Sequence, residues 1–221
     1  MALLPLVLSA SKSSWQAPMG HGEARANPAL HSVISKRFNH TCQYCGWVDE
    51  EYNEVSHIDE DHTNNSEENL TLACPLCHQC LHLGHAASAE GGKMIWCPEL
   101  SQVQLNNLAR VYWMTEFEPD HPFLMSSRTM VTKIEHQTHE LEAYYIQGAS
   151  DPGFWAEVLL KLTPEQYAKR GDLLKNIRLW PSIHRFKKMV PKWTKKVTIN
   201  LPSKEWSRLA LSKPFNDVEI E

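Results

Sequence analysis

Two pairs of closely spaced cysteines constrain the fold of this chain more than any other feature. Cys42 and Cys45 form one C-x2-C pair, and Cys74 and Cys77 form a second pair after a gap of 28 residues. Two intervening residues let a tight turn present both thiolates to one ion, at about 2.3 Å each. Gly46 follows the first pair, where such a turn often requires a positive φ. The spacing therefore predicts one tetrahedral Zn²⁺ site that closes loops and replaces missing core.

The compartment and the remaining cysteines fit this interpretation. The start of the chain lacks the basic residues of a signal peptide, so we expect a cytosolic protein whose six cysteines bind metal or pack, without forming disulfides. Cys77 also forms a C-x2-C pair with Cys80. We prefer Cys74 with Cys77 because the motif downstream sets that register, and we expect Cys80 and Cys97 to be packed thiols. Two nearby histidines are expected to lie on the surface: His82 and His85.

Charge is distributed unevenly along the chain. Residues 41–150 carry 17 acidic and 4 basic side chains, a net charge of −13, whereas residues 151–221 carry a net charge of +6. The acidic segment disfavours binding to nucleic acid around the cysteine pairs. The basic segment suits nucleic acid, anionic lipid or an acidic protein partner, or is a solvated helical surface. No apolar run reaches the roughly 18 residues of a membrane-spanning helix, and we expect residues 3–8 to be a buried strand.

The region between the cysteine pairs resembles the HNH nuclease motif. That motif has a histidine near the end of a strand, an asparagine five residues before the second cysteine pair and a histidine directly after it, which here are His57, Asn69 and His78. The resemblance implies that the first histidine activates water and the asparagine positions the site. In the family an aspartate before the first histidine holds the catalytic ion. Ser56 stands there, and a hydroxyl is a poor substitute for a carboxylate on a hard ion.

The loop that follows does not restore the motif. Asp59, Glu60 and Asp61 offer carboxylates, and Asp61 with His62 even repeats the Asp-His dipeptide. However, His62 is only seven residues before Asn69, and the glycine pair and the later lysine of the motif are missing. We therefore favour a degenerate site. The alternatives are a metal-dependent HNH endonuclease that cuts DNA with the first histidine as general base, and histidines unrelated to the motif.

Further stretches resemble the IcmJ/DotN family of type IVB secretion systems. They are TCQYCGW, the second cysteine pair, GGKMIWCPELSQVQLNNLARVYW, NIRLWP and MVPKW, and together they span residues 35–193. The resemblance implies a non-enzymatic, zinc-containing subunit of the type IV coupling complex. It also implies that the protein binds the C-terminal tail of the coupling ATPase and contacts other coupling-complex subunits. The complex would then recruit effector proteins for export. The protein would then be cytoplasmic and peripheral at the bacterial inner membrane.

Beyond the cysteine pairs the sequence predicts mostly helices. Residues 94–96 are a strand candidate. Ser101 and Gln104 form a capping box that begins a helix with an apolar face containing Leu105 and Ala109. A helix beginning at Thr163 would bury its residues 173, 174 and 177. Four other helices are predicted. One covers residues 122–147 with Gly148 as its cap, and the next begins at Asp151-Pro152. The last two run from Pro181 to Pro191 and over residues 203–211.

The predicted architecture is α+β. An HNH-like zinc module of small β-hairpins, a helix and cysteine turns would occupy residues 1–98, with an α-helical bundle over residues 99–221 packed on it. The apolar helix faces are expected to be core, and the alternative is a groove for a partner helix. Any of four tryptophans that stays exposed would be a binding anchor: Trp113, Trp155, Trp180 and Trp193. Five lysines are expected at the rim of such a groove, facing an acidic partner or the anionic leaflet: Lys187, Lys188, Lys192, Lys195 and Lys196.

Overall fold

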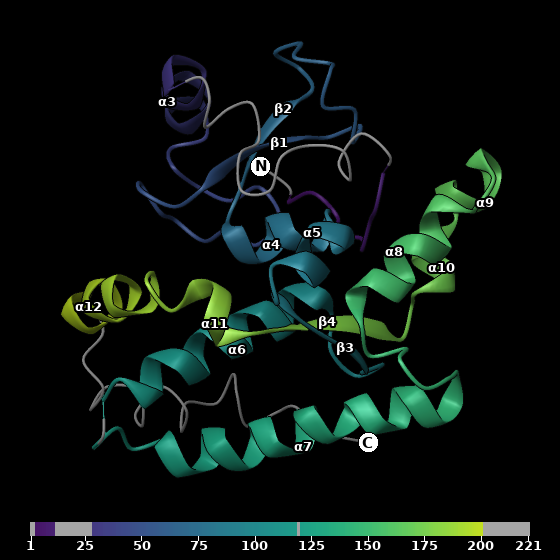
Figure 1. Ribbon diagram of the computed structural model, residues 1–221. Helices are drawn as coiled ribbons and strands as arrows, with labels where there is room; N and C mark the ends of the chain where they lie inside the picture. Colours follow the sequence, from purple (N-terminus) through teal and green to yellow (C-terminus); the bar gives the residue numbers. More distant parts are fainter. Residues whose placement is uncertain (1–2, 12–27, 119, 201–221) are drawn as a thin grey trace.

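A computed structural model describes residues 3–11, 28–118 and 120–200 of the chain (Figure 1). Within these residues, helices of different lengths surround two antiparallel sheets of two strands each. Figure 1 shows one sheet in the upper part of the molecule and the other in the lower part, between helices. Among the described helices, none has the length and the apolar character that crossing a membrane requires.

The upper part is the predicted zinc module. Helix α3 (Pro28–Arg37) covers the hairpin of β1 (Glu54–His57) and β2 (Leu70–Ala73), in which Val55 lies opposite Leu72. Apolar side chains of the three elements form a small core. Helix α4 (Pro75–Cys80) follows β2 directly, and its proline occupies the first turn, where the missing N–H group costs nothing. The expected combination of hairpin, helix and cysteine turns is confirmed.

The second sheet joins two distant parts of the chain. Helix α5 (Leu83–Ser88) precedes β3 (Gly92–Trp96), which pairs with β4 (Ile177–Pro181) so that Met94 lies opposite Leu179. The strand predicted at residues 94–96 is therefore confirmed and is slightly longer. Its partner strand was not expected.

The two longest helices pack on this sheet. Helix α6 (Gln102–Glu116) packs on β4, and both hydrogen bonds of its capping box are present, as predicted. Helix α7 (Leu124–Tyr144) packs on β3 and is shorter than predicted at both ends. Gly148 does not cap it. With φ of 90°, this glycine lies in the turn that follows, in a conformation that disfavours larger residues.

The predicted helix that begins at Thr163 is wrong in its second half. Helix α8 (Pro152–Leu160) is capped by Asp151 as expected, but the next helical stretch divides into α9 (Pro164–Ala168) and α10 (Arg170–Leu173). Ile177 begins β4 and is not on a helix. The predicted helix extends too far because the apolar residues keep a helical spacing up to Ile177. The pairing of β4 with β3 overrides that local pattern.

The short helix predicted between Pro181 and Pro191 is present as residues 183–186, but both of its predicted bounds are wrong. Pro181 ends β4, a short helix α11 (Ile183–Phe186) follows, and α12 (Val190–Asn200) starts just before Pro191. A proline is as compatible with the first turn of a helix as with a helix end, and here it belongs to the first turn. The helix predicted over residues 203–211 lies outside the described residues.

The strand predicted over residues 3–8 is wrong as well. Single backbone hydrogen bonds attach this segment to the module: Leu4 N donates to Gln43 O at 2.8 Å, and Ser9 N donates to Cys80 O at 2.9 Å. These two acceptors lie on different elements, so no ladder forms. The apolar residues of the segment pack into two cores instead of pairing with a strand: Leu4 contacts the core around the cysteines, and Leu8 lies in the core that contains Trp155 of α8.

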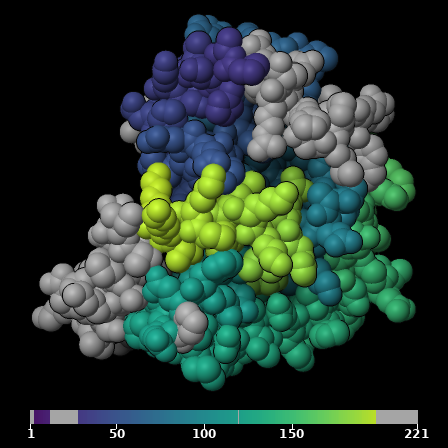
Figure 2. Space-filling view, turned by 60° about the vertical axis from the view of Figure 1, so that its left-hand side comes forward, coloured from purple at the N-terminus to yellow at the C-terminus, as the bar shows by residue number. Residues whose placement is uncertain are grey.

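All four tryptophans singled out in the sequence are core residues. Each tryptophan is exposed by 6% or less, so none is a surface anchor for a partner. For these four residues, the prediction that the apolar faces form core is confirmed. Trp113 stacks on Phe186 with ring centroids 5.5 Å apart. Trp193 belongs to α12, whose segment lies between the zinc module and the teal helices (Figure 2).

Candidate metal centre

The four paired cysteines meet in one place. Their sulfur atoms all lie within 4.8 Å of one another, and the Sγ atoms of Cys45 and Cys74 are 3.6 Å apart. Four sulfurs at about 2.3 Å from a tetrahedral ion would be about 3.8 Å from each other. The donor set therefore fits a tetrahedral metal ion, and four thiolates suit Zn²⁺. Among the described residues, no other group of three or more such ligands is this close together.

Local backbone structure positions both cysteine pairs. In the first turn, Gly46 N donates to Cys42 O at 2.9 Å, and the φ of 76° at Gly46 lets the chain turn back. In the second pair, Cys74 is the N-cap of α4 and Cys77 lies in its first turn. Cys80, one turn later, donates its thiol hydrogen to Leu76 O at 3.2 Å and is not part of the four-sulfur group. The structure thus brings Cys77 together with Cys74, the register preferred from the sequence.

Helix α6 supplies polar partners to the sulfurs, which sequence reasoning missed. Arg110 Nη2 donates to Cys74 Sγ at 3.3 Å, and Asn106 Nδ2 lies 3.7 Å from Cys77 Sγ. Asn106 and Arg110 are four positions apart, so both project from the same face of the helix. Arg110 is only 2% exposed. A buried guanidinium requires a negative partner. The sequence signal that could have revealed this contact is a charged residue among the apolar residues of α6.

The thiols differ in acidity according to their surroundings. Burial alone raises the pKa of the Cys74 thiol, but hydrogen bonds with the three neighbouring cysteines and the positive charge of Arg110 hold it well below its usual range. By contrast, burial raises the pKa of the Cys80 thiol far above its usual range. Metal ions bind the thiolate. The surroundings of Cys74 therefore favour its thiolate, whereas hydrogen bonds with the neighbouring cysteines raise the pKa of Cys42 and Cys77 in the same group. Position outside the four-sulfur group, and not acidity, is what separates Cys80 from the four candidate ligands.

A group of histidines lies beside this centre. The ring centroids follow one another from His57 to His62 at 4.9 Å, from His62 to His82 at 5.1 Å and from His82 to His78 at 4.6 Å. The expectation that His82 lies on the surface is wrong, because its side chain is packed among these rings and is 7% exposed. His85 is half-buried, with its ring 6.2 Å from that of His82.

Hydrogen bonds determine how two of these rings are protonated. His78 Nδ1 lies 2.6 Å from a carboxylate oxygen of Glu54, so this nitrogen carries a hydrogen and donates it. His78 Nε2 lies 3.2 Å from His82 Nε2. Burial, followed by the charges of the neighbouring histidines, lowers the pKa of His82 well below its usual range, so His82 is neutral at pH 7. These two nitrogens therefore share one hydrogen bond.

The carboxylates after β1 are engaged in fixing the loop. Asp59 accepts from Asn64 Nδ2 at 2.7 Å, and Asp61 accepts from the hydroxyl and the backbone N–H of Thr63. Glu60 forms an ion pair with Arg170. Ser56, at the position where the HNH motif has its metal-binding aspartate, is 1% exposed in the middle of β1. Each of these three carboxylates therefore has a structural partner within the protein.

Asn69 also holds this loop. Its side-chain oxygen accepts from Asp59 N at 3.0 Å, and its amide donates to Asn64 O at 2.8 Å. His57 Nε2 lies 3.1 Å from Asn65 Oδ1 in the same loop. The asparagine thus positions the segment that follows the first histidine, and it touches neither His57 nor His78 by a described hydrogen bond.

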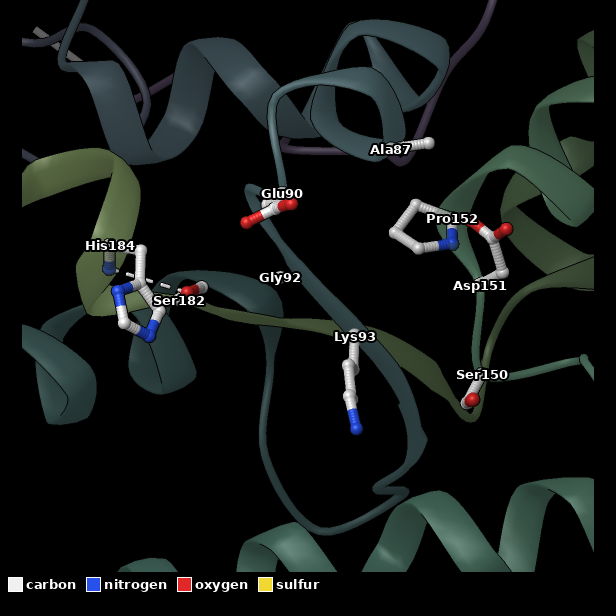
Figure 3. A pocket seen from close by; sticks show the side chains of 9 residues that line it. All are labelled: Ala87, Glu90, Gly92, Lys93, Ser150, Asp151, Pro152, Ser182 and His184. Carbon is white, nitrogen blue, oxygen red and sulfur yellow. Dashed lines mark hydrogen bonds between the residues drawn. The ribbon is translucent and has the colours of Figure 1, made fainter.

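A separate hollow of about 410 Å³ lies between the start of β3, the start of α8 and the end of β4 (Figure 3). Its lining mixes negative and positive groups, since Glu90, Asp151 and Lys93 all belong to it (Figure 3). No cysteine and none of the clustered histidines lines it. The hollow is therefore distinct from the metal centre and selects for no single charge.

Known proteins resemble this chain both around the cysteine pairs and over most of its length. The HNH endonuclease family profile matches residues 42–83, which hold both cysteine pairs and the segment between them. Over 190 residues the chain is 30% identical to the type 4 apparatus protein DotN of Legionella pneumophila subsp. pneumophila strain Philadelphia 1. That similarity covers 85% of this chain and 88% of the relative, so it extends beyond the cysteine pairs into the helices.

Proposed function

The chain belongs to the IcmJ/DotN family, and from this premise we propose that it is a zinc-containing, non-catalytic subunit of a type IV secretion apparatus. The observation that carries the proposal is the closed four-sulfur site. Four protein ligands complete a tetrahedron, and Asn106 and Arg110 cover two of the sulfurs, so no position remains for a substrate or water. Such closed sites stabilise folds, whereas catalytic zinc keeps one position open.

The finer proposal concerns the partner. The protein acts as an adaptor that binds the C-terminal tail of the coupling ATPase, next to other coupling-complex subunits, and so helps to recruit effector proteins. Support comes from the basic segment around α12. Lys192 pairs with Glu51 and Lys196 donates to Val48 O, whereas three further lysines are exposed beside them: Lys187, Lys188 and Lys195. An acidic partner or the anionic inner leaflet is complementary to this surface.

Removing the C-terminal tail from the ATPase should abolish recovery of this protein with the ATPase from membrane extracts. The interaction depends on that tail, and the basic surface adds charge complementarity that raises the association rate. The measurement is affinity purification of the ATPase followed by quantitative mass spectrometry. Reversing the charge of Lys187 and Lys188 to glutamate should lower recovery several-fold at low salt. The matched control is Lys133→Glu, on the exposed face of α7. Unchanged recovery with the truncated ATPase contradicts the adaptor proposal.

A metal-dependent nuclease is the second candidate, because the HNH profile matches and His57, His62, His82 and His78 adjoin one another. The chemistry argues against it. Hard ions such as Mg²⁺ take oxygen ligands, and the carboxylates of the loop after β1 are engaged with Asn64, Thr63 and Arg170. The carboxylate beside the histidine group, Glu54, is paired with His78, and Ser56 stands where the motif has its metal-binding aspartate.

Purified protein should not cut DNA. Supercoiled plasmid incubated with the protein and Mg²⁺ or Mn²⁺ should show no more nicking than plasmid in buffer with the same ion. Gel electrophoresis over several hours measures this. Cleavage that disappears in His57→Ala and persists in His136→Ala, an exposed histidine on α7, would establish the nuclease instead.

A further inference from the structure

A row of aromatic rings lies on the surface where α7 ends beside β3. The ring centroids of Trp96 and Tyr144 are 5.1 Å apart, and those of Tyr144 and Tyr145 are 4.9 Å apart. Tyr144 is 70% exposed and Tyr145 is 44% exposed. Large aromatic surfaces exposed side by side are unusual for a surface without a binding role. We name Trp96, Tyr144 and Tyr145 the aromatic platform.

The platform rests on a fixed base. Trp96 is the last residue of β3 and Tyr144 the last residue of α7. The ring of Tyr145 meets the buried Trp155 edge to face, with centroids 5.1 Å apart, and Trp155 donates its indole hydrogen to Ala149 O at 2.7 Å. The Tyr145 ring, held in this way, supports the neighbouring Tyr144 ring and loses little conformational entropy when a ligand binds.

A hollow of about 280 Å³ opens on this platform. It is lined by Trp96, Tyr144, Ala143 and Glu140. The carboxylate of Glu140 is available, because its side chain is 58% exposed and its ion pair with His136 has the long distance of 4.0 Å. The hollow therefore combines two aromatic side chains, one small apolar side chain and one carboxylate.

We propose that this hollow receives a lysine or arginine side chain from a basic segment of a partner protein. A lysine or arginine cation is attracted to the faces of tryptophan and tyrosine rings, and it donates a charge-assisted hydrogen bond to a carboxylate. A purely apolar occupant would bury Glu140 without a partner, which costs free energy. An acidic peptide or an anionic lipid surface would be repelled by the same carboxylate and by the excess of acidic residues in residues 41–150.

The site is independent of the basic surface in the adaptor proposal. Helix α12 lies at the left of Figure 1, whereas the C-terminal end of α7 lies at the right. The two surfaces also carry opposite charge preferences. A partner with an acidic segment suits the lysines near α12, and a basic segment suits the aromatic platform.

The test uses a ten-residue peptide of alternating arginine and serine as the probe. Fluorescence anisotropy of the labelled peptide measures its affinity for the full-length protein. Tyr144→Ala and Glu140→Gln should each weaken binding about threefold to tenfold, and Tyr144→Phe should keep the affinity. A peptide in which citrulline replaces arginine should bind at least tenfold more weakly, because citrulline has the same shape without the charge.

Two control variants match these changes. Met125→Ala removes a side chain that is also 70% exposed on α7, and Glu157→Gln neutralises an exposed glutamate with a similarly long ion pair to Lys161. Both should leave binding unchanged. Equal binding of the citrulline peptide, or equal loss in the controls, overturns the proposal. The proposal is also overturned if Tyr144→Ala leaves peptide binding unchanged and weakens only self-association or only binding to phosphatidylglycerol vesicles. The occupant of the hollow would then be a second copy of the chain or a membrane.

Discussion

Replacing Cys74 by serine should release the metal and unfold the zinc module. Cys74 is fully buried, its sulfur lies 3.6 Å from that of Cys45, and it joins β2 to α4 as the N-cap of that helix. Metal binding contributes about 10–16 kcal/mol of apparent free energy to folding in small structural zinc sites. That is as large as the whole free energy of unfolding of an ordinary domain, about 5–15 kcal/mol. Losing one ligand of four removes most of this contribution.

Elemental analysis and thermal unfolding measure the effect of this substitution. Zinc should fall from about one ion per chain to nearly none, and the cooperative unfolding transition of the module should disappear. Cys80→Ser and Cys97→Ser are the matched controls, since both replace a buried thiol outside the four-sulfur group. Both should keep the zinc. Wild-type protein purified without any zinc would refute the metal assignment, and loss of zinc in Cys80→Ser would move the second ligand pair to Cys77 and Cys80.

The cysteine cluster was predictable because its spacing reflects local structure. Each C-x2-C pair forms within one turn, and the turns need only Gly46 and the start of α4 to take shape. The same reason explains why α6 and α8 were found from Ser101 and Asp151, whose side chains accept hydrogen bonds from backbone groups two or three residues later. Such contacts are written in a few consecutive residues, so a single sequence reveals them.

Features that join distant residues escaped the prediction. The local pattern predicts that Ile177 is a core residue of a helix, but in the structure it pairs in a sheet with Trp96, 81 positions earlier. His82 reads as a surface residue until the loop carrying His62 packs over it. Arg110 lies 36 positions from Cys74. Nothing in the local pattern around these residues encodes the partner, so tertiary contact decides each of them.

The second large effect is expected at Arg110, the buried cation beside the sulfurs. Arg110→Met keeps most of the side-chain volume and removes the charge, so the thiolates lose their positive partner. Breaking a buried charge pair typically costs about 3–5 kcal/mol, and losing a hydrogen-bond partner of a metal ligand typically lowers metal affinity about 10- to 100-fold. We expect effects of this size in urea unfolding and in competition with a chromophoric zinc chelator.

This substitution should also loosen helix α12. The guanidinium of Arg110 lies 4.1 Å from the ring centroid of Trp47 and 5.4 Å from that of Trp193, so one side chain lies against the first cysteine turn and α12 together. Trp193 further donates its indole hydrogen to Asp49 at 2.7 Å. Amide hydrogen exchange in α12 should therefore rise more than exchange in α7 when Arg110 is lost. Arg110→Lys should give an intermediate result, because it keeps the charge but not the planar group that stacks on the rings.

Arg128→Met is the control that separates a buried charge from an exposed one. Arg128 forms a two-pronged ion pair with Glu116, at 2.7 and 2.8 Å, but its side chain is 51% exposed. Water screens such a pair, so its loss should cost no more than about 1 kcal/mol and leave the zinc affinity unchanged. If the Arg110 and Arg128 variants have the same stability and the same zinc affinity, Arg110 does not offset the charge of the sulfurs. The contacts of α6 with the cysteine cluster would then be packing alone, and the affinity of the site for its ion would rest on the four thiolates.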